Sequence, residues 1–421
     1  MSENKKMNNT AAAQKESIRT LSGSKQKFDV KQYGMLIALL VIIMLFYILT
    51  GGKLLKPMNV SNLIFQNAYV IILAIGMLLC ILTGGNIDLS VGSVVGLVGA
   101  CAGVFIIEWK WNVYLSIGLC LIIGILIGMW QGFWIAYVGI PPFICTLSGM
   151  LVFRGFTLLI LNGMTLAPFP DAYQRLSTGF IPDIVEGFTL GGTKLNLLCM
   201  LVGIIIAVGF AVSQFTTNAS RKRKGYDYQP MSMLIVKSAV IGAAVIYVFW
   251  LLARYRGIPT VLIILGILLV VYSFFTQKTV KGRHLYAIGG NMKAARLSGI
   301  KTKRMMFFAY TNMAFIASIA GLVFAARLNS ASPTAGQSFE MDAIASCFIG
   351  GASAYGGTGT VSGALIGALI MGILNNGMSI LGINSNMQQV VKGLVLLGAV
   401  AFDVISKNNL ITLPRFGKKN A

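Results

Sequence analysis

The sequence predicts an all-α polytopic membrane protein with about 10–12 transmembrane helices, on the basis of three observations. Of its 421 residues, 56% are hydrophobic, and the mean hydropathy is +0.78. Only 11% of the residues are charged, against roughly one quarter in a soluble globular protein. Apolar runs of about 20 residues, the length that spans a bilayer, recur along most of the chain.

The net charge of +22 is explained by the topology of a membrane protein rather than by a nucleic-acid interface. Loops rich in Lys and Arg stay on the cytoplasmic side of a membrane, where anionic lipid attracts them. We therefore expect a membrane protein with both termini in the cytoplasm, membrane lipid as a partner, and no nucleic-acid partner. Twenty-three of the 34 basic residues, with only four acidic ones, lie in 1–31, 216–230, 277–304 and 406–421.

Three regions follow from this charge pattern. Residues 1–32 are predicted to form a flexible basic cytoplasmic tail, because they lack the early apolar core of a cleavable signal peptide. Residues 33–405 form a single transmembrane domain. Residues 406–421 form a second basic cytoplasmic tail.

The first half of the domain contains five predicted spans. The second span stops at the glycine-rich sequence TGGNIDLSVGS, and the third stops at the polar patch EWKWN. The fourth ends with Trp130, Trp134 and Tyr137, the aromatic belt expected at a membrane interface. Pro141 and Pro142 mark the turn into the fifth. The five spans are 33–50, 63–82, 89–107, 114–137 and 143–161.

A long polar interval, 162–194, precedes the second half, and counting from an inside N-terminus places this interval outside. The sixth span ends at the basic run 221–224, which belongs inside. The seventh and eighth spans form a hairpin around 254–257, and the ninth follows 277–304. These four spans are 195–215, 231–253, 258–275 and 305–328.

The Gly/Ala/Ser-rich run 343–359 either crosses the membrane or only re-enters it. We favour a crossing, because it returns the basic C-terminus to the inside after spans 361–381 and 387–405. Short glycine-interrupted segments are where irregular transmembrane backbone occurs. We therefore expect broken or glycine-rich segments near 83–93 and 343–360.

Two glycine-rich sequences resemble each other. TGGNIDLSVGSVVGLVGA (83–100) and YGGTGTVSGALIGALIMG (355–372) each place a Gly–Gly pair before a helix with small residues at three- and four-residue spacing. An internal repeat explains this likeness, and so does the close packing of helices on small residues.

Residues 277–304 form a water-exposed stretch between two spans, with eight Lys or Arg, the only histidine, and no Asp or Glu. Within this stretch, the sequence of residues 291–298 predicts a short helix, which Asn291 caps and Gly299 ends. A small-residue helix between glycines can pack closely against another protein. An ordinary positively charged loop has the same composition.

Acidic residues lie next to two of the spans. Asp88 is expected to cap the helix that follows it and to lie at its positive dipole end; an intramembrane ionisable residue is also a functional candidate. Glu340 and Asp342 precede 343–359 on the outer side. They are expected to face the mouth of a path or another protein, with helix capping by Asp342 as the alternative.

Five polar side chains fall inside predicted spans. Lys392 lies near a span end and is expected to snorkel, whereas Arg154 lies deeper and is expected to need a partner carboxylate. Asn375, Asn376 and Gln131 are expected to hydrogen-bond either a neighbouring helix or a hydroxylated solute.

Catalytic and metal-binding motifs are missing from the sequence. The six cysteines have no CxxC spacing and are expected to be buried, reduced core residues. The nearest approach to a phosphate-binding loop, 187–193, lacks the lysine, so the chain is not a P-loop ATPase. We expect no enzyme, no cofactor bound by this chain, and no metal.

Five motifs are specific in sequence and in order: IDLSVGS (87–93), WQGFWIAYVGIPPFICTLSGMLVFRG (130–155), GRHLYAIGGNMKAARLSGI (282–300), MDAIASCFIGGASAYGG (341–357) and VVKGLVLLGAVAFD (390–403). They resemble the monosaccharide ABC-importer permeases, most of all the xylose or multiple-monosaccharide branch of the superfamily that includes ribose and branched-chain amino-acid permeases. The resemblance covers about 59–403.

The resemblance implies the permease subunit of an ATP-driven importer in the bacterial cytoplasmic membrane, which moves a monosaccharide by alternating access. ATP and Mg²⁺ would bind a separate ABC ATPase subunit, an extracytoplasmic binding protein would deliver the sugar, and a second permease copy would complete the unit. It implies ATPase coupling through Gly282, Arg283, Tyr286, Gly289, Gly290, Asn291, Ala294, Ala295, Arg296, Ser298 and Gly299. We expect Asp88, Ser90, Gly92, Gly350, Gly351, Asn375 and Asn376 along the path or at a hinge, and Glu340 and Asp342 on the binding-protein side.

Other functional classes stay open beside this one. An ion-coupled secondary transporter typically carries acidic or His groups in its core, whereas the acidic residues here lie mostly at span ends. An ABC permease for a nucleoside or a branched-chain amino acid fits the same sequence features, because selectivity in such systems lies largely in the binding protein. The hypothesis of a non-transporting membrane scaffold is inconsistent with a resemblance to transport proteins over most of the chain.

Overall fold

The computed structural model describes residues 30–183, 189–190, 193–226 and 228–407. Most of the two predicted basic tails, at 1–29 and 408–421, lies outside these residues. Within the described part, regular structure is helical apart from two paired two-residue strands, β1 (Thr189–Leu190) and β2 (Thr193–Lys194). Ten described helices are long and apolar enough to cross a membrane, which confirms the predicted all-α polytopic class.

The helix bounds agree with the predicted spans to within a few residues at most ends, and α9 begins and ends where the sequence predicts. The long helices are α2 (Val30–Leu49), α3 (Pro57–Leu82), α4 (Val91–Gly103), α5 (Val113–Phe133), α6 (Pro142–Ile160), α8 (Leu197–Arg223), α9 (Met231–Ala253), α10 (Val261–Lys278), α13 (Thr302–Leu328), α15 (Val361–Ile380) and α16 (Ser385–Lys407). The short ones are η1 (Lys53–Leu55), η2 (Val104–Glu108), η3 (Trp134–Val138), α7 (Asp171–Thr178), α11 (Val280–Gly290), α12 (Met292–Leu297) and α14 (Phe339–Ile349).

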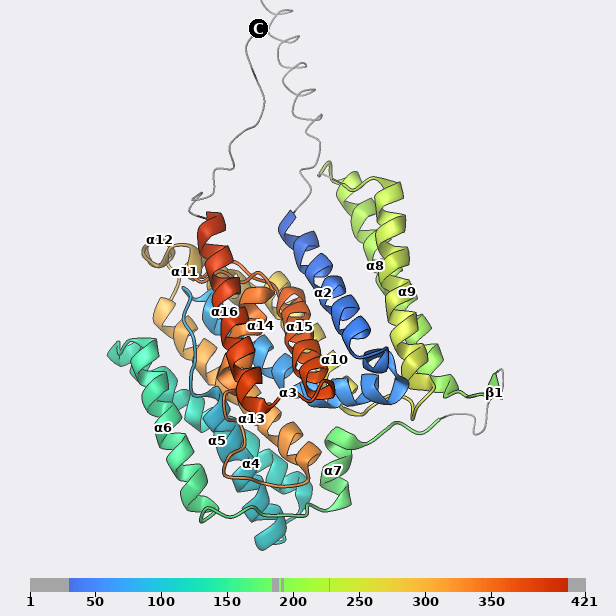
Figure 1. Cartoon of the computed structure of the whole chain (residues 1–421). Helices are drawn as coiled ribbons and strands as arrows, with labels where there is room; N and C mark the ends of the chain where they lie inside the picture. The colour runs from blue at the N-terminus through green and yellow to red at the C-terminus, as the bar shows by residue number, and fades with distance from the viewer. Residues whose placement is uncertain (1–29, 184–188, 191–192, 227, 408–421) are drawn as a thin grey trace, which may run out of the picture.

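The helix bundle has two distinct ends (Figure 1). At one end, which we call the basic end, lie the start of α2, the α8–α9 connection, α11, α12 and the end of α16. At the opposite end lie the α4–α5 turn and α7. The basic runs at 221–224 and 277–304, which the structure describes, therefore lie on one side of the bundle.

Helices α3, α4 and α13 form the centre of the bundle. The most apolar stretches of α3 and α4 are each 83% buried and that of α13 is 61% buried, against 17% for α8. Small residues allow this close packing: a side chain at Gly321 of α13 would meet the backbone of Val95 in α4. The α8–α9 hairpin packs on itself and reaches the bundle mainly where α9 contacts α3 (Figure 1).

The run 343–359 takes part in a crossing, as predicted, but only half of that crossing is helical. Ala331 pairs with Leu166 at the opposite end, whereas Gly351 lies beside Met35 of α2 at the basic end. Between them α14 has 11 residues, too short to span a bilayer alone. The run is therefore broken, as the sequence predicts near 343–360: α14 ends at Ile349, and glycines with positive φ angles keep the segment that follows non-helical.

The bundle contains an inverted repeat of helix order. Helices α3 to α6 consist of a buried helix, an irregular segment, a short helix and two crossings, and α13 to α16 repeat this order in the opposite direction. The packing repeats as well: the short helix α4 contacts α6, and the short helix α14 contacts α16. The structural counterpart of 83–90 is therefore 329–338, and the sequence likeness of 83–100 to 355–372 does not mark the repeat.

Candidate functional site

The predicted coupling stretch folds as two consecutive helices with opposite exposure. Helix α11 lies against the bundle, with Leu285 and Ile288 fully buried. Helix α12 projects from the basic end, and most of its side chains are exposed. The stretch is therefore an anchored helix joined directly to an exposed one.

Helix α11 is held on both glycine-rich turns of the bundle. A methyl group at Gly289 would overlap the carbonyl oxygen of Leu82 and the backbone of Gly357. The Tyr286 hydroxyl donates to the carbonyl oxygen of Gly359 at 2.8 Å. Burial raises the pKa of Tyr286, so this hydroxyl stays protonated as a donor. Any displacement of α11 must therefore displace these turns.

The two glycine-rich turns also contact each other. Gly85, which follows α3, packs on the carbonyl oxygen of Ala354, and Gly356 packs on Gly84. The backbone N–H of Gly357 donates to the carbonyl oxygen of Leu82 at 3.2 Å. Both turns need glycine, because these residues combine positive φ angles with backbone-to-backbone contact.

Helix α12 has the caps that the sequence predicts. The Asn291 Oδ1 accepts a hydrogen bond from the Ala294 N–H at 3.0 Å, and Gly299 ends the helix with a φ of +84°. The sequence analysis missed its most exposed apolar residue. Leu297 is 90% exposed, and an apolar side chain within a strongly basic stretch is the signal that would have identified it.

The remaining predicted coupling residues divide between these two helices. Gly282 is buried against the carbonyl oxygens of Phe275 and Thr276, whereas Gly290 faces open space. Arg283, Ala294, Arg296 and Ser298 are exposed, and Ala295 is buried.

Asp88 lies in the irregular segment that leads into α4. Its Oδ1 accepts hydrogen bonds from the Ser90 N–H at 2.9 Å and the Ser90 hydroxyl at 2.6 Å. The Gln131 Nε2 of α5 donates to the Ser90 Oγ at 2.8 Å. The predicted helix cap is wrong, because α4 begins at Val91 and Asp88 bonds the residue before it.

Asp342 lies inside the bundle, where it joins three helices. It forms an ion pair with Lys392 of α16 at 3.0 Å and accepts a hydrogen bond from the Tyr69 hydroxyl of α3 at 3.0 Å. Two expectations are corrected here. Lys392 does not snorkel, because it has a buried partner; and Asp342, 1% exposed and four residues into α14, neither caps the helix nor faces the outer surface.

Two crossings are broken, in that each combines an irregular segment with a short helix: 83–103, which contains α4, and 329–349, which contains α14. These two broken crossings meet through their glycines. A side chain at Gly336 would overlap the backbone of Gly92, and the Glu340 carboxylate lies against Gly92 in the first turn of α4. Arg154 Nη1 donates to the carbonyl oxygens of Pro333 and Ala335, at 3.3 and 2.7 Å. Arg154 therefore hydrogen-bonds backbone carbonyls, and the Glu340 carboxylate lies one turn of α4 away, near enough to interact with it electrostatically, as the expected partner carboxylate.

The other predicted path residues lie elsewhere. Gly350 and Gly351 belong to the α14–α15 turn at the basic end. The Asn376 Nδ2 donates to the Asn59 Oδ1 at 3.3 Å and the Gln66 Oε1 at 3.2 Å, so it bonds a neighbouring helix. The neighbouring Asn375 has a buried Oδ1 without a hydrogen-bond donor among the described residues.

One face of α3 is polar, and the sequence analysis missed it. The residues that form it are Asn59, Asn62, Gln66 and Tyr69, at spacings of three and four within an apolar helix. That spacing is the signal that could have revealed it. The face runs from the opposite end of the bundle toward Asp342.

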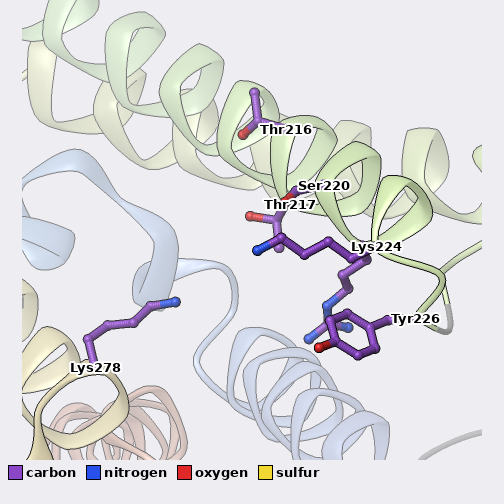
Figure 2. Close-up of a pocket in the computed structure, with 7 residues that line it drawn as sticks. Thr216, Thr217, Ser220, Lys224, Tyr226 and Lys278 are labelled. Atoms are coloured by element: carbon purple, nitrogen blue, oxygen red, sulfur yellow. The ribbon is translucent and has the colours of Figure 1, made fainter.

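A basic cleft of about 760 Å³ opens between the α8–α9 hairpin and α10 at the basic end. Figure 2 shows Lys224 and Lys278 pointing toward each other across it, with Thr216, Thr217 and Ser220 along one wall. Its hydroxyl and ammonium groups suit an anionic headgroup.

All six cysteines are free and buried, which confirms their expected core role. No cluster of three His, Cys, Asp or Glu suited to a metal occurs within the described part of the chain.

Comparison with known proteins agrees with this membrane-spanning architecture. Residues 59–400 match the family model described as "Branched-chain amino acid transport system / permease component". The chain belongs to this permease family. Family membership and the ten apolar helices together establish a multi-pass membrane protein that acts as a transport subunit rather than an enzyme.

Relatives of this permease extend over nearly its whole length. It is 39% identical to the xylose transport system permease protein XylH of Haemophilus influenzae, over 91% of this chain and 98% of that one. It is 40% identical to XylH of Escherichia coli K12, over 92% and 94%. It is 33% identical to the ribose import permease protein RbsC of E. coli K12, over 91% and 98%. No solved structure gave a significant match.

Proposed function

We propose that this chain is the membrane-spanning permease of an ATP-driven importer that moves xylose, or a related pentose or hexose, by alternating access. The observation that carries the proposal is the coupling segment, in which exposed α12 is joined directly to α11, and α11 is buried against both glycine-rich turns. The xylose and ribose permeases among its relatives support the sugar class.

A separate ABC ATPase subunit docks on α12 and binds the ATP and Mg²⁺. The exposed Leu297 provides an apolar anchor within a small basic helix, which suits insertion into a groove of the partner. Closure of the ATPase moves α12 and, through Gly289 and Tyr286 of α11, the turns after α3 and α14. These turns lead into the two broken crossings, whose rearrangement opens the path to one side or the other.

The basic end faces the cytoplasm, because Lys and Arg are retained on that side. Both termini therefore lie in the cytoplasm of the bacterium, and the extracytoplasmic sugar-binding protein docks at the opposite end. A second copy of the chain completes the unit, so that each of the two ATPase domains receives one α12. Anionic lipid of the cytoplasmic leaflet occupies the basic cleft of Figure 2.

Reconstitution with the cognate ATPase and binding protein tests the proposal. Leu297→Glu should abolish ATP-dependent xylose uptake and the association of the ATPase, while the permease still folds, because this side chain is 90% exposed. Gly289→Ala should also block uptake, since its methyl group overlaps the turns.

Gly290→Ala is the matched control for Gly289→Ala, because the neighbouring glycine faces open space. It should transport normally. Uptake by the chain alone, driven by a proton or sodium gradient and indifferent to ATP, would contradict the proposal. ATPase stimulation only by a binding protein loaded with another solute class would contradict the sugar assignment.

A further inference from the structure

A cavity of about 300 Å³ opens at the opposite end of the bundle, between α3, α13, the segment after α7 and the α9–α10 turn. This volume lies at the lower end of the roughly 300–1,000 Å³ typical of small-molecule pockets, so the cavity suits a small solute. The side chains that line it are Asn62, Phe65, Gln66, Thr178, Phe180, Tyr255, Arg256 and Arg327.

The cavity contains polar groups without protein partners. The side chains of Asn62 and Arg327 make no hydrogen bond to another residue within the described part of the chain. Gln66 accepts from Asn376 through its Oε1, which leaves its NH₂ group for a ligand. Amides donate and accept while a guanidinium donates, and together they complement hydroxyl groups. Among the described residues no carboxylate lines the cavity, so an ammonium group would find no counter-charge from them.

Aromatic rings form one wall of the cavity. Phe180 packs edge-on against Phe65 and Tyr255, with ring centroids 5.5 and 6.1 Å apart. The Arg256 guanidinium lies 5.8 Å from the Phe180 centroid and 5.6 Å from that of Tyr255, which holds these rings in place. A wall of fixed rings opposite amides suits the C–H face of a sugar ring.

The cavity leads toward the interior. Gln66 lines the cavity, and Tyr69, three residues further along the same face of α3, donates a hydrogen bond to Asp342. The polar face of α3 therefore continues from the cavity to the second broken crossing. A solute bound here would lie at the outer start of a polar route.

We propose that this cavity is a subsite for a neutral monosaccharide, a pentose or hexose in its ring form. The subsite receives the sugar at the end opposite to the coupling segment, before it enters the broken crossings. The proposal rests on the proposed function and adds a sugar site within the permease itself.

Thiol labelling tests this site without transport. The six native cysteines are buried, so the thiol introduced by Asn62→Cys is the reactive one in the purified full-length chain. At a D-xylose concentration ten times the dissociation constant, labelling by a hydrophilic maleimide should slow by roughly tenfold. Met164→Cys, at a 64% exposed position in the α6–α7 connection, should label at the same rate with and without the sugar.

Three outcomes of this labelling experiment would overturn the subsite. They are labelling of Asn62→Cys that D-xylose does not slow, equal slowing at both positions, and protection by leucine or a nucleoside but not by any pentose or hexose.

Transport separates the failure of the subsite from the failure of the proposed function. In the complex with ATPase and binding protein, Asn62→Leu and Tyr255→Ala should each lower xylose uptake by roughly threefold to tenfold, with the stimulated ATPase activity retained. Tyr114→Ala, an exposed ring outside the cavity, should leave uptake unchanged. Normal uptake by both cavity variants would overturn the subsite alone, whereas an unsubstituted chain that imports no sugar would overturn the proposed function.

Discussion

The two broken crossings of this permease hold their carboxylates in different ways. In the first, Asp88 accepts hydrogen bonds only from Ser90, and its second oxygen has no donor among the described residues. In the second, Asp342 joins α14 to α3 and α16 through Tyr69 and Lys392. Short-range neutral contacts thus position the first carboxylate, and a long-range ion pair positions the second.

This difference indicates how each crossing responds to movement. A carboxylate bonded to its own segment can travel with that segment, whereas an ion pair between helices opposes their separation because each buried charge needs the other. We therefore expect the first crossing to tolerate changes of charge and the second to resist them. The contact between the crossings, at Gly92 and Gly336, is common to both.

The largest effect is expected where the crossings touch. Gly336→Ala should lower the free energy of unfolding by about 4 kcal/mol, as backbone strain of about 1–2 kcal/mol adds to overlap with the Gly92 backbone. Thermal unfolding in detergent measures this. Gly163→Ala is the control, because its φ of +71° nearly equals the +74° of Gly336 but its surroundings are open. Equal losses for both variants would show that the crossings do not depend on this contact.

A smaller loss is expected at the ion pair. Asp342→Asn should cost about 3 kcal/mol, the low end for a broken buried pair, because the Lys392 side chain is still 20% exposed. The double variant Asp342→Leu with Lys392→Met should recover most of this stability, since no unpaired charge is left. A single variant as stable as the unsubstituted chain would remove the contrast between the crossings.

A still smaller loss of stability is expected when the hydrogen bond from Gln131 to Ser90 is removed, since Ser90 in turn donates to the Asp88 carboxylate. Gln131→Leu removes one donor to Ser90, and the Gln131 Oε1 has no hydrogen-bond donor within the described residues. The expected loss of unfolding free energy is about 1 kcal/mol. Denaturant titration followed by intrinsic fluorescence measures it, and a loss as large as that of Asp342→Asn would contradict the comparison.

The smallest effect is expected at Asp88 itself. Asp88→Asn keeps an oxygen that can accept from Ser90 and removes a buried charge without a basic partner, so the unfolding free energy should change by less than about 1 kcal/mol. Uptake measured in parallel separates structure from transport. Full stability with reduced uptake would indicate that the charge serves the transport cycle.

Sequence reasoning succeeded where the physical cause is local. The bounds of α9 follow from a run of apolar residues that must match the bilayer. The short helix α12 follows from Asn291 and Gly299, because helix caps act within a few residues. The family motifs likewise predicted the permease class that the comparisons show.

Only the tertiary structure decided the partners of the polar residues. Lys392 is 50 residues from Asp342 in the sequence, and Tyr69 is 273 residues from it. No local sequence pattern could therefore predict that these three side chains meet. The same holds for the cavity, whose walls come from four separate segments. A buried polar group must find a partner wherever the fold supplies one. The sequence by itself therefore determined most spans of this protein and the caps of α12, and the packing of distant helices decided how its charges are paired.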